Sequence, residues 1–283
     1  IQYGPYYYTQ ENIQELVKYA AARGITIIPE VDFPGHSLAA LSAFPELSCK
    51  GGQFEPLSDM TTSEDVFCPG NDKAIETAKD IIDEIVSIFG HNYIHIGGDR
   101  CSTSRWEQCE KCKKRYQDLK LTECDQLRHY FVKQILEHTR SKGYVAIGWD
   151  DVYSVQLNRS TIVMGNHLQS GVNAANDHYK VVMTPSTRLY MSQYQYTTDD
   201  SFEYAPYGYK TLSVAYNYDG TEGVFDDCVG NIIGLQGSLW TEFVWGEDED
   251  MFYKLYPRMC AIAESAWTSK ENRNYNRFLG AFL

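Results

Sequence analysis

The sequence has no apolar run that approaches the roughly 20 residues of a membrane span, so we expect no such span in it. Basic residues are also few, with 25 Lys and Arg against 38 Asp and Glu and a formal net charge of −13. Because binding to phosphates requires a basic surface, this balance argues against a nucleic acid partner. The chain begins at Ile1 without a signal-peptide pattern, so we expect any targeting segment to lie outside it.

Low-complexity segments, internal repeats of 20–50 residues and a linker that would divide the chain are absent as well. The 283 residues therefore suit one large domain of the size of an α/β barrel. Aromatic residues are abundant, with 22 Tyr, 12 Phe and 5 Trp. Tyr and Trp combine an apolar ring with a polar group, which suits sugar-binding clefts as well as ordinary packing.

The eight cysteines have more than one interpretation; they are Cys49, Cys68, Cys101, Cys109, Cys112, Cys124, Cys228 and Cys260. An even, scattered set indicates an oxidising location (secreted, periplasmic or lysosomal-type) with some disulfides. Cys49 and Cys68 flank a long loop, and we expect them to form one. Alternatively, the C-x7-C-x2-C-x11-C pattern of Cys101, Cys109, Cys112 and Cys124 is compatible with zinc, or the thiols stay free and buried.

Apolar strand-like runs alternate with helical patterns along the chain. A helix is expected after Thr9, where Ile13, Leu16 and Val17 recur at helical spacing, with Gly24 at its end. Six strands are expected, at 25–32, 93–99, 145–150, 161–166, 180–184 and 231–237. Strands that alternate with helices predict a parallel sheet, with functional residues at the carboxyl ends of the strands.

Polar and Trp residues collect at those carboxyl ends. The run Tyr93-Ile94-His95-Ile96-Gly97-Gly98-Asp99-Arg100 shows the pattern most clearly, because an apolar strand stops at two glycines and an acid. The residues at the five strand ends are Glu30, Asp32, Asp99, Arg100, Trp149, Asp150, Asp151, Asn166, His167, Trp240 and Glu242. In a (β/α)8 barrel such positions surround one mouth. A mouth with Trp, Tyr and carboxylates suits a carbohydrate, although ordinary loop polarity would give a similar pattern.

The same strand ends lie in seven blocks: YYTQENIQELVKYAAARGITIIPEVDFPGHS, YIHIGGD, SRWEQCEKC, AIGWDDV, VVMTPSTRLY, GSLWTEF and RMCAIAESAWT. In this order the blocks resemble glycoside hydrolase family 20, the β-N-acetylhexosaminidases, and bacterial secreted members most of all. The resemblance covers nearly the whole chain. It implies a (β/α)8 TIM barrel, with residues 1–283 as a single catalytic-type domain whose first two strands would precede Ile1.

The resemblance also implies a chemistry. Family members cleave terminal N-acetylglucosamine or N-acetylgalactosamine from glycans or chitooligosaccharides, without a cofactor or metal, and the sugar's own acetamido oxygen is the nucleophile. An Asp orients that acetamido group, and a neighbouring Glu protonates the leaving oxygen. Asp99 matches the Asp, but Arg100 stands where the Glu is expected. Since a guanidinium keeps its protons at any ordinary pH, we expect hydrolysis to be lost or strongly impaired.

Further binding residues follow from the same resemblance. It implies that Trp149 forms a wall and Trp240 the floor of the sugar pocket, and that Tyr190 contacts the acetamido carbonyl. It implies that Glu242 binds the sugar's distant hydroxyls and that His36 supports the acid.

Two more positions depart from the family pattern. Asn166 stands where a Trp usually walls the pocket, and Ser192 replaces a hydroxyl-binding Asp. Two alternatives to a sugar-binding relative without hydrolysis stay open. One is an active enzyme with another proton donor, such as Glu107, Asp150 or Glu30, and the other is a non-catalytic structural protein.

Overall fold

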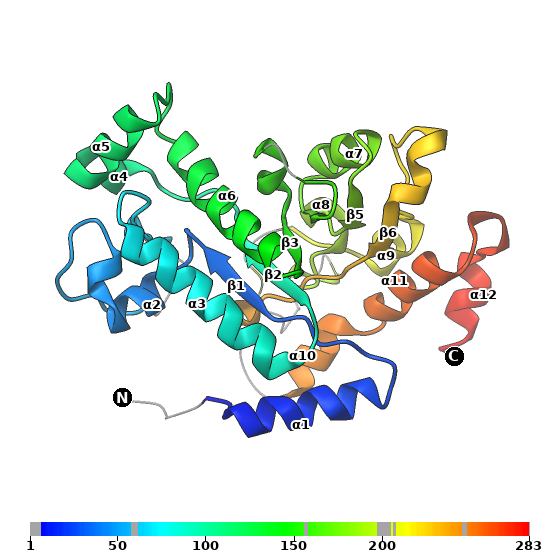
Figure 1. Cartoon of the computed structure of the whole chain (residues 1–283). Coiled ribbons are helices and arrows are strands. Elements are labelled where there is room, and N and C mark those ends of the chain that lie inside the picture. The colour runs from blue at the N-terminus through cyan, green and yellow to red at the C-terminus, as the bar shows by residue number, and fades with distance from the viewer. Residues whose placement is uncertain are drawn as a thin grey trace. The chain divides into compact units, whose positions relative to one another are not determined.

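The structure is a computed structural model that describes residues 7–57, 62–155, 158–196, 205, 208–244 and 248–282. The chain divides into two compact units, residues 1–157 and 158–283. In the described ranges each unit contains three parallel strands and the helices that pack against them (Figure 1).

The first unit contains β1 (Glu30–Phe33), β2 (Tyr93–Gly97) and β3 (Val145–Trp149). β2 pairs in parallel with both neighbours, with Glu30 opposite His95 and Tyr93 opposite Val145. β1 is shorter than the predicted strand 25–32. Pro29 has no N–H to donate to a ladder, and Ile25 and Ile28 are exposed, so these residues run into the sheet without pairing as a regular strand.

Helices cover the strands of this unit. They are α1 (Gln10–Ala21), α2 (Leu38–Ala43), α3 (Asp72–Phe89), α4 (Ser104–Gln108), α5 (Glu110–Asp118), α6 (Gln126–Ser141), and the 3-10 turns η1 (Pro45–Leu47) and η2 (Asp150–Ser154). α1 begins as predicted, with the Thr9 side chain accepting from the Asn12 N–H. α3 packs against both α1 and α6, as Figure 1 shows. Phe33, Phe67 and Phe131 form an aromatic core that joins the end of β1 to α6.

The second unit contains β4 (Ile162–Gly165), β5 (Lys180–Met183) and β6 (Ile232–Leu235), with parallel pairing on both sides of β5. Its helices are α7 (Leu168–Asn176), α8 (Ser186–Leu189), α9 (Leu212–Asn217), α10 (Asp248–Leu255), α11 (Arg258–Trp267) and α12 (Tyr275–Gly280), with the 3-10 turns η3 (Asp226–Asn231), η4 (Thr241–Phe243) and η5 (Lys270–Asn272). A Tyr-rich insertion was also expected from the sequence over 190–225; within it, residues 197–204 and 206–207 lie outside the described residues.

All six predicted strands are found, and every strand pairing described within a unit is parallel. The fold class of a (β/α)8 barrel is thus confirmed, with six of its strands in the described part of the chain. A helix that is both long and apolar enough to cross a membrane is not found among the described helices.

Candidate active site

The two glycines after β2 make room for Asp32. Gly97 and Gly98 have φ values of 65° and 86°, which few other residues adopt. The Gly98 N–H donates to Asp32 Oδ1 at 3.0 Å, and a Cβ atom on Gly97 would overlap the Asp32 carboxyl group. The apolar strand therefore stops at two glycines because the end of β1 places a carboxyl group directly against it.

Asp32, His36 and Asp99 form one hydrogen-bonded and electrostatically linked group. His36 Nε2 lies 3.2 Å from Asp99 Oδ2, and this hydrogen bond is the main reason that the pKa of His36 rises to about 9. Burial, followed by the charge of Asp99, raises the pKa of Asp32 to about 8. Near neutral pH, Asp32 is therefore largely protonated and His36 is positively charged.

Asp99 has one oxygen atom in an unusual position. Its Oδ1 is buried, and no group among the described residues donates a hydrogen bond to it. A buried carboxylate oxygen without a donor is costly, so Oδ1 is an acceptor left unsatisfied within the protein, while the Asp99 side chain as a whole stays 29% exposed.

Arg100 turns toward β3. Its Nε lies 3.4 Å from Asp151 Oδ1, and its backbone N–H donates to Asp151 Oδ2 at 3.3 Å. The Arg100 side chain is 83% exposed, whereas that of Asp151 is 18% exposed. The guanidinium thus lies at the surface of the strand end, held by the carboxylate that follows Trp149-Asp150.

Trp149 is fixed by two neighbours on the adjacent strands. Its indole Nε1–H donates to Glu30 Oε1 at 2.9 Å, and the ring meets His95 edge-on with centroids 4.8 Å apart. His95 Nδ1 in turn lies 3.2 Å from Glu30 Oε1. Trp149 is buried and cannot turn without breaking these contacts, so it is held in one orientation at the end of β3.

The three alternative proton donors differ in their burial and in their hydrogen bonds. Glu30 is bound to Trp149, as described above, and Asp150 is buried in η2. Glu107 is exposed on α4, where it accepts from the Thr103 hydroxyl at 3.1 Å. Asp32 was not proposed as a donor from the sequence, yet its raised pKa makes it a carboxyl group that can still carry a proton near neutral pH.

A cavity of about 350 Å³ opens beside this group. Its lining residues are His36, Leu38, Ala39, Pro56, Leu57, Thr62, Ser63, Val66, Arg100, Cys101 and Ser102. The volume falls in the range of small-molecule sites, roughly 300–1,000 Å³. Most of its wall comes from the long loop between β1 and α3, with His36 and Arg100 at its polar end.

The second unit holds the remaining predicted residues. The Tyr190 hydroxyl donates to Asn166 Oδ1 at 2.8 Å, and the Tyr190 and Trp240 rings meet edge-on at 6.2 Å. Ser192 is buried, and its Oγ accepts from the Trp240 N–H at 3.2 Å. Glu242 follows in η4 and is exposed. Asn166, Tyr190, Ser192 and Trp240 are therefore one connected set at the carboxyl ends of β4, β5 and β6.

Sequence reasoning missed three features of these strand ends. It named Asp32 and Asp151 among the polar residues at the strand ends without giving either a role, and it did not consider His95. The alternation in YIHIG puts His95 on the face of β2 opposite to Ile94 and Ile96, which is the signal that could have identified it.

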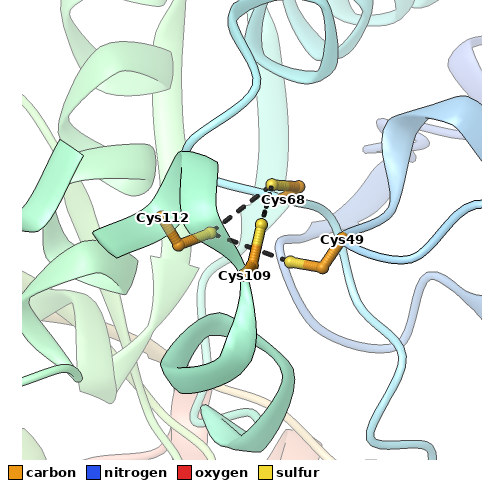
Figure 2. A group of neighbouring side chains, drawn as sticks. All are labelled: Cys49, Cys68, Cys109 and Cys112. Atoms are coloured by element: carbon orange, nitrogen blue, oxygen red, sulfur yellow. Dashed lines mark hydrogen bonds between the residues drawn. The ribbon is translucent and has the colours of Figure 1, made fainter. Parts of the chain in front are cut away.

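The cysteine predictions need correction. All eight thiols are free, so the Cys49–Cys68 disulfide is not formed. The expected zinc set also differs from the observed grouping: Cys109 and Cys112 gather with Cys49 and Cys68, all four Sγ atoms lying within 4.8 Å of one another (Figure 2). Cys101 and Cys124 do not belong to this group. Atoms of Asp32, His36 and Asp99 also lie within 4.8 Å of one another, but the bond between His36 and Asp99 occupies atoms that a metal would need.

Parallel strands with polar and aromatic side chains at their carboxyl ends are typical of the class of (β/α) barrels, which place their functional residues at that end. A family model described as "Glycosyl hydrolase family 20, catalytic domain" matches residues 2–270. The chain therefore belongs to glycosyl hydrolase family 20.

Curated relatives include a beta-hexosaminidase of Porphyromonas gingivalis, 37% identical over 276 residues, which covers 96% of this chain and 35% of that protein. A beta-hexosaminidase of Vibrio furnissii is 30% identical over 276 residues, covering 93% of this chain and 44% of that one.

Solved structures of family 20 proteins are also similar to this chain. A GH20 exo beta-N-acetylglucosaminidase of Vibrio harveyi, in complex with N-acetylglucosamine, has a TM-score of 0.83 at 27% identity, covering 98% of this chain and 44% of that one. The beta-N-acetylhexosaminidase of Bacteroides fragilis has a TM-score of 0.81 at 27% identity, covering 99% and 56%. The chain thus spans about a third to just over half the length of these four proteins.

Proposed function

We propose that this family 20 barrel binds a terminal N-acetylhexosamine of a glycan or chitooligosaccharide and that its hydrolytic activity is lost or strongly impaired. The observation that carries the proposal is the place of Arg100. It directly follows Asp99, where the family resemblance puts the catalytic acid, and its side chain is held by Asp151.

A guanidinium at this place fails in two ways. It cannot give a proton to the leaving oxygen, and loss of a general acid typically costs about 10²–10⁴-fold in rate. It also adds a positive charge where the transition state of glycoside cleavage develops positive charge, so the cost is expected at the upper end of that range or beyond.

Sugar binding is supported by the groups that remain. The Asp99 side chain is 29% exposed, so its carboxylate can accept a hydrogen bond from the N–H of an acetamido group. Within the first unit Trp149 provides a ring suited to a sugar face; within the second unit Tyr190 and Trp240 provide such rings, and Glu242 is exposed. His36 keeps Asp99 oriented through its hydrogen bond. No cofactor or metal enters this proposal.

A second candidate function is an active hexosaminidase with Asp32 as proton donor. It is favoured by one observation, the pKa of about 8 that burial and the charge of Asp99 give to Asp32. In that case activity would fall as the pH rises through 8, and Asp32→Asn would abolish it. The half-buried place of Asp32, packed against Gly97 and Gly98, favours the first proposal.

The location of the protein is also a proposal. The expected oxidising compartment had been supported in part by disulfides, and the structure has free thiols. A secreted, periplasmic or lysosomal-type location now rests on the resemblance to the family alone.

The deciding experiment uses the full-length protein that contains this chain, with the Bacteroides fragilis relative as positive control. We expect no measurable turnover of an aryl N-acetylglucosaminide. By calorimetry we expect binding of N-acetylglucosamine but not of glucose, and loss of that binding in Asp99→Ala. Turnover within about tenfold of the relative would overturn the loss of hydrolysis, and absence of binding would overturn sugar recognition.

A further inference from the structure

The four thiols of Cys49, Cys68, Cys109 and Cys112 have the spacing of a metal site. The Sγ atom of Cys112 lies 3.4 Å from that of Cys68 and 3.7 Å from that of Cys49, and Cys68 lies 3.9 Å from Cys109. Four sulfurs around a tetrahedral zinc ion, at Zn–S of about 2.3 Å, lie roughly 3.8 Å apart. These three distances are close to the edge of a zinc tetrahedron, and all four sulfurs lie within 4.8 Å of one another.

These four thiols come from two separate parts of the first unit. An antiparallel bridge between Ser48 and Phe67 brings Cys49 and Cys68 side by side from the two ends of the long loop after β1. Cys109 is the N-cap residue of α5, and Cys112 lies in its first turn. The partial positive charge of a helix N-terminus favours thiolates, so this Cys-x2-Cys pair suits a cation that needs them deprotonated.

The two parts meet so closely that they need a glycine. A Cβ atom on Gly70 would overlap the backbone of Lys111 and Cys112. On the other side Trp106 and Val66 are almost fully buried against the thiols, and the Trp106 indole donates to the Phe67 carbonyl at 3.1 Å. The sulfurs therefore lie in a packed shell, which is typical of structural rather than catalytic zinc.

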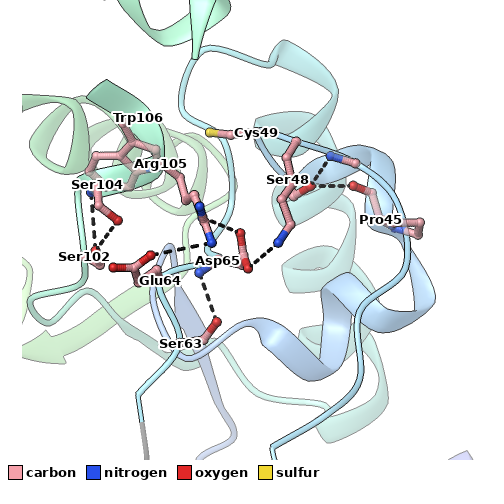
Figure 3. Close-up of polar contacts among 12 residues, drawn as sticks. Pro45, Ser48, Cys49, Ser63, Glu64, Asp65, Ser102, Ser104, Arg105 and Trp106 are labelled. Atoms are coloured by element: carbon pink, nitrogen blue, oxygen red, sulfur yellow. Dashed lines mark hydrogen bonds and ion pairs between the residues drawn. The ribbon is translucent and has the colours of Figure 1, made fainter. Parts of the chain in front are cut away.

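A network of charged residues holds the same two parts together (Figure 3). Asp65 binds Lys50 Nζ through Oδ2 at 2.9 Å and Arg105 Nε through Oδ1 at 2.9 Å. Glu64 adds a second acidic contact to Arg105 at 3.5 Å. Lys50 directly follows Cys49 in the chain, and Arg105 lies in the helix just before Cys109. The network therefore ties the segment that contains Cys49 to the helix just before Cys109.

We propose that Cys49, Cys68, Cys109 and Cys112 bind one zinc ion as a structural tetrathiolate site. Binding converts four thiols and Zn²⁺ into the zinc tetrathiolate and releases four protons, with no change of oxidation state. The site joins the loop after β1 to the helices after β2. Pro56, Leu57 and Val66 of that loop line the cavity beside His36 and Arg100, so zinc would hold one wall of this cavity in place.

Two other interpretations of the four thiols fit their distances less well. Disulfides would need sulfurs about 2.05 Å apart, and Cys112 stands near both Cys49 and Cys68 although it could pair with only one of them. An iron–sulfur cluster would hold its thiolates further apart, because several irons and sulfides occupy the space between them.

The test uses the full chain, purified from zinc-supplemented cells under anaerobic conditions without chelators. Elemental analysis should find about one zinc per chain, and Cys68→Ser and Cys112→Ser should each lose at least nine-tenths of it. Cys124→Ser is the matched control, because Cys124 packs against the same shell but is not one of the four thiols. That variant should keep its zinc.

A measurement on the unmodified chain keeps the test decisive if the serine variants fail to fold. X-ray absorption at the zinc edge should show four sulfur neighbours at about 2.3 Å. Nitrogen or oxygen neighbours, zinc well below one per chain, or disulfides among these four cysteines in mass spectra of the alkylated protein would each overturn the proposal. None of these results depends on the sugar-binding function.

Discussion

Arg100 forms its ion pair with Asp151 at 3.4 Å, and among the described residues Asp99 is instead bonded to His36 at 3.2 Å. The side chains of these two consecutive residues therefore have different partners. Asp99 keeps its hydrogen bond to His36, and its side chain remains 29% exposed. Arg100 is held at the end of β3 by Asp151 and leaves the Asp99–His36 hydrogen bond intact.

The first prediction tests the proposal that Arg100 stands in place of a catalytic acid. Arg100→Glu in the full-length protein should raise turnover of an aryl N-acetylglucosaminide at least tenfold above the parent, because Asp151 close by would raise the pKa of the new carboxyl group. Recovery should remain partial, since Asn166 and Ser192 still differ from the family pattern.

Arg100→Gln is the matched control for this experiment. It removes the positive charge without supplying a proton donor, so it should show no such increase. Equal gains in Arg100→Glu and Arg100→Gln would mean that the charge, rather than the missing acid, limits the reaction.

The second prediction concerns stability and pH. The raised pKa of Asp32 means that the native state keeps a proton that the unfolded state loses, so stability should fall as the pH rises from 3.8 to about 8. The pKa of His36 is raised from 6.5 to about 9, so its contribution is complete below 6.5 and is lost as the pH rises through 9. Both groups therefore make the protein less stable at alkaline pH.

Asp32→Asn tests this assignment, because Asn keeps the shape and the acceptor for the Gly98 N–H but cannot ionise. The free energy of unfolding, measured by urea between pH 5 and 8, should decline less steeply in Asp32→Asn than in the parent. Asp118→Asn, an exchange on the surface of α5, should leave the slope unchanged. An unchanged slope in Asp32→Asn would contradict a raised pKa at this position.

The alternation of apolar runs and helical patterns predicted six strands and their parallel direction, because burial on both faces leaves that pattern in the sequence itself. The start of β1 was predicted too early, since the apolar run before Pro29 has the composition of a strand but lacks a donor where the ladder begins. Element type is thus a local property here, whereas the exact limit of a strand depends on its partner.

The side-chain pairs could not be predicted in the same way. Arg100 meets Asp151, and Tyr190 meets Asn166, because residues distant in sequence end up at neighbouring strand ends. Likewise, spacing alone grouped Cys109 and Cys112 with nearby cysteines. Cys49 and Cys68 reach Cys109 and Cys112 only through the tertiary packing of the loop that carries them, which spacing does not reveal.

The third prediction concerns the glycine against Asp32. Gly97→Ala would require a side chain at φ 65° and would also overlap the Asp32 carboxyl group. We expect a loss of at least about 2 kcal/mol in the free energy of unfolding.

Gly143→Ala is the control, because Gly143 has φ 76° but nothing lies within 4 Å of the added Cβ atom. Its loss should be limited to backbone strain, about 1 kcal/mol. Similar losses for the two variants would show that contact with Asp32 does not require the glycine.

The fourth prediction concerns competition for the Tyr190 hydroxyl. This hydroxyl donates to Asn166 at 2.8 Å, so a ligand carbonyl would have to replace Asn166 as its acceptor. Because one hydrogen bond is exchanged for another, Tyr190→Phe should weaken binding of N-acetylglucosamine by less than about threefold. In an Asn166→Ala background the competing acceptor is removed, and the same exchange should cost about tenfold.

Calorimetry on the four proteins of this cycle measures the difference, with Tyr209→Phe, on an exposed tyrosine, as the control. Equal effects of Tyr190→Phe in both backgrounds would show that Asn166 does not compete with the ligand, whereas absence of binding in all four would instead refute sugar recognition.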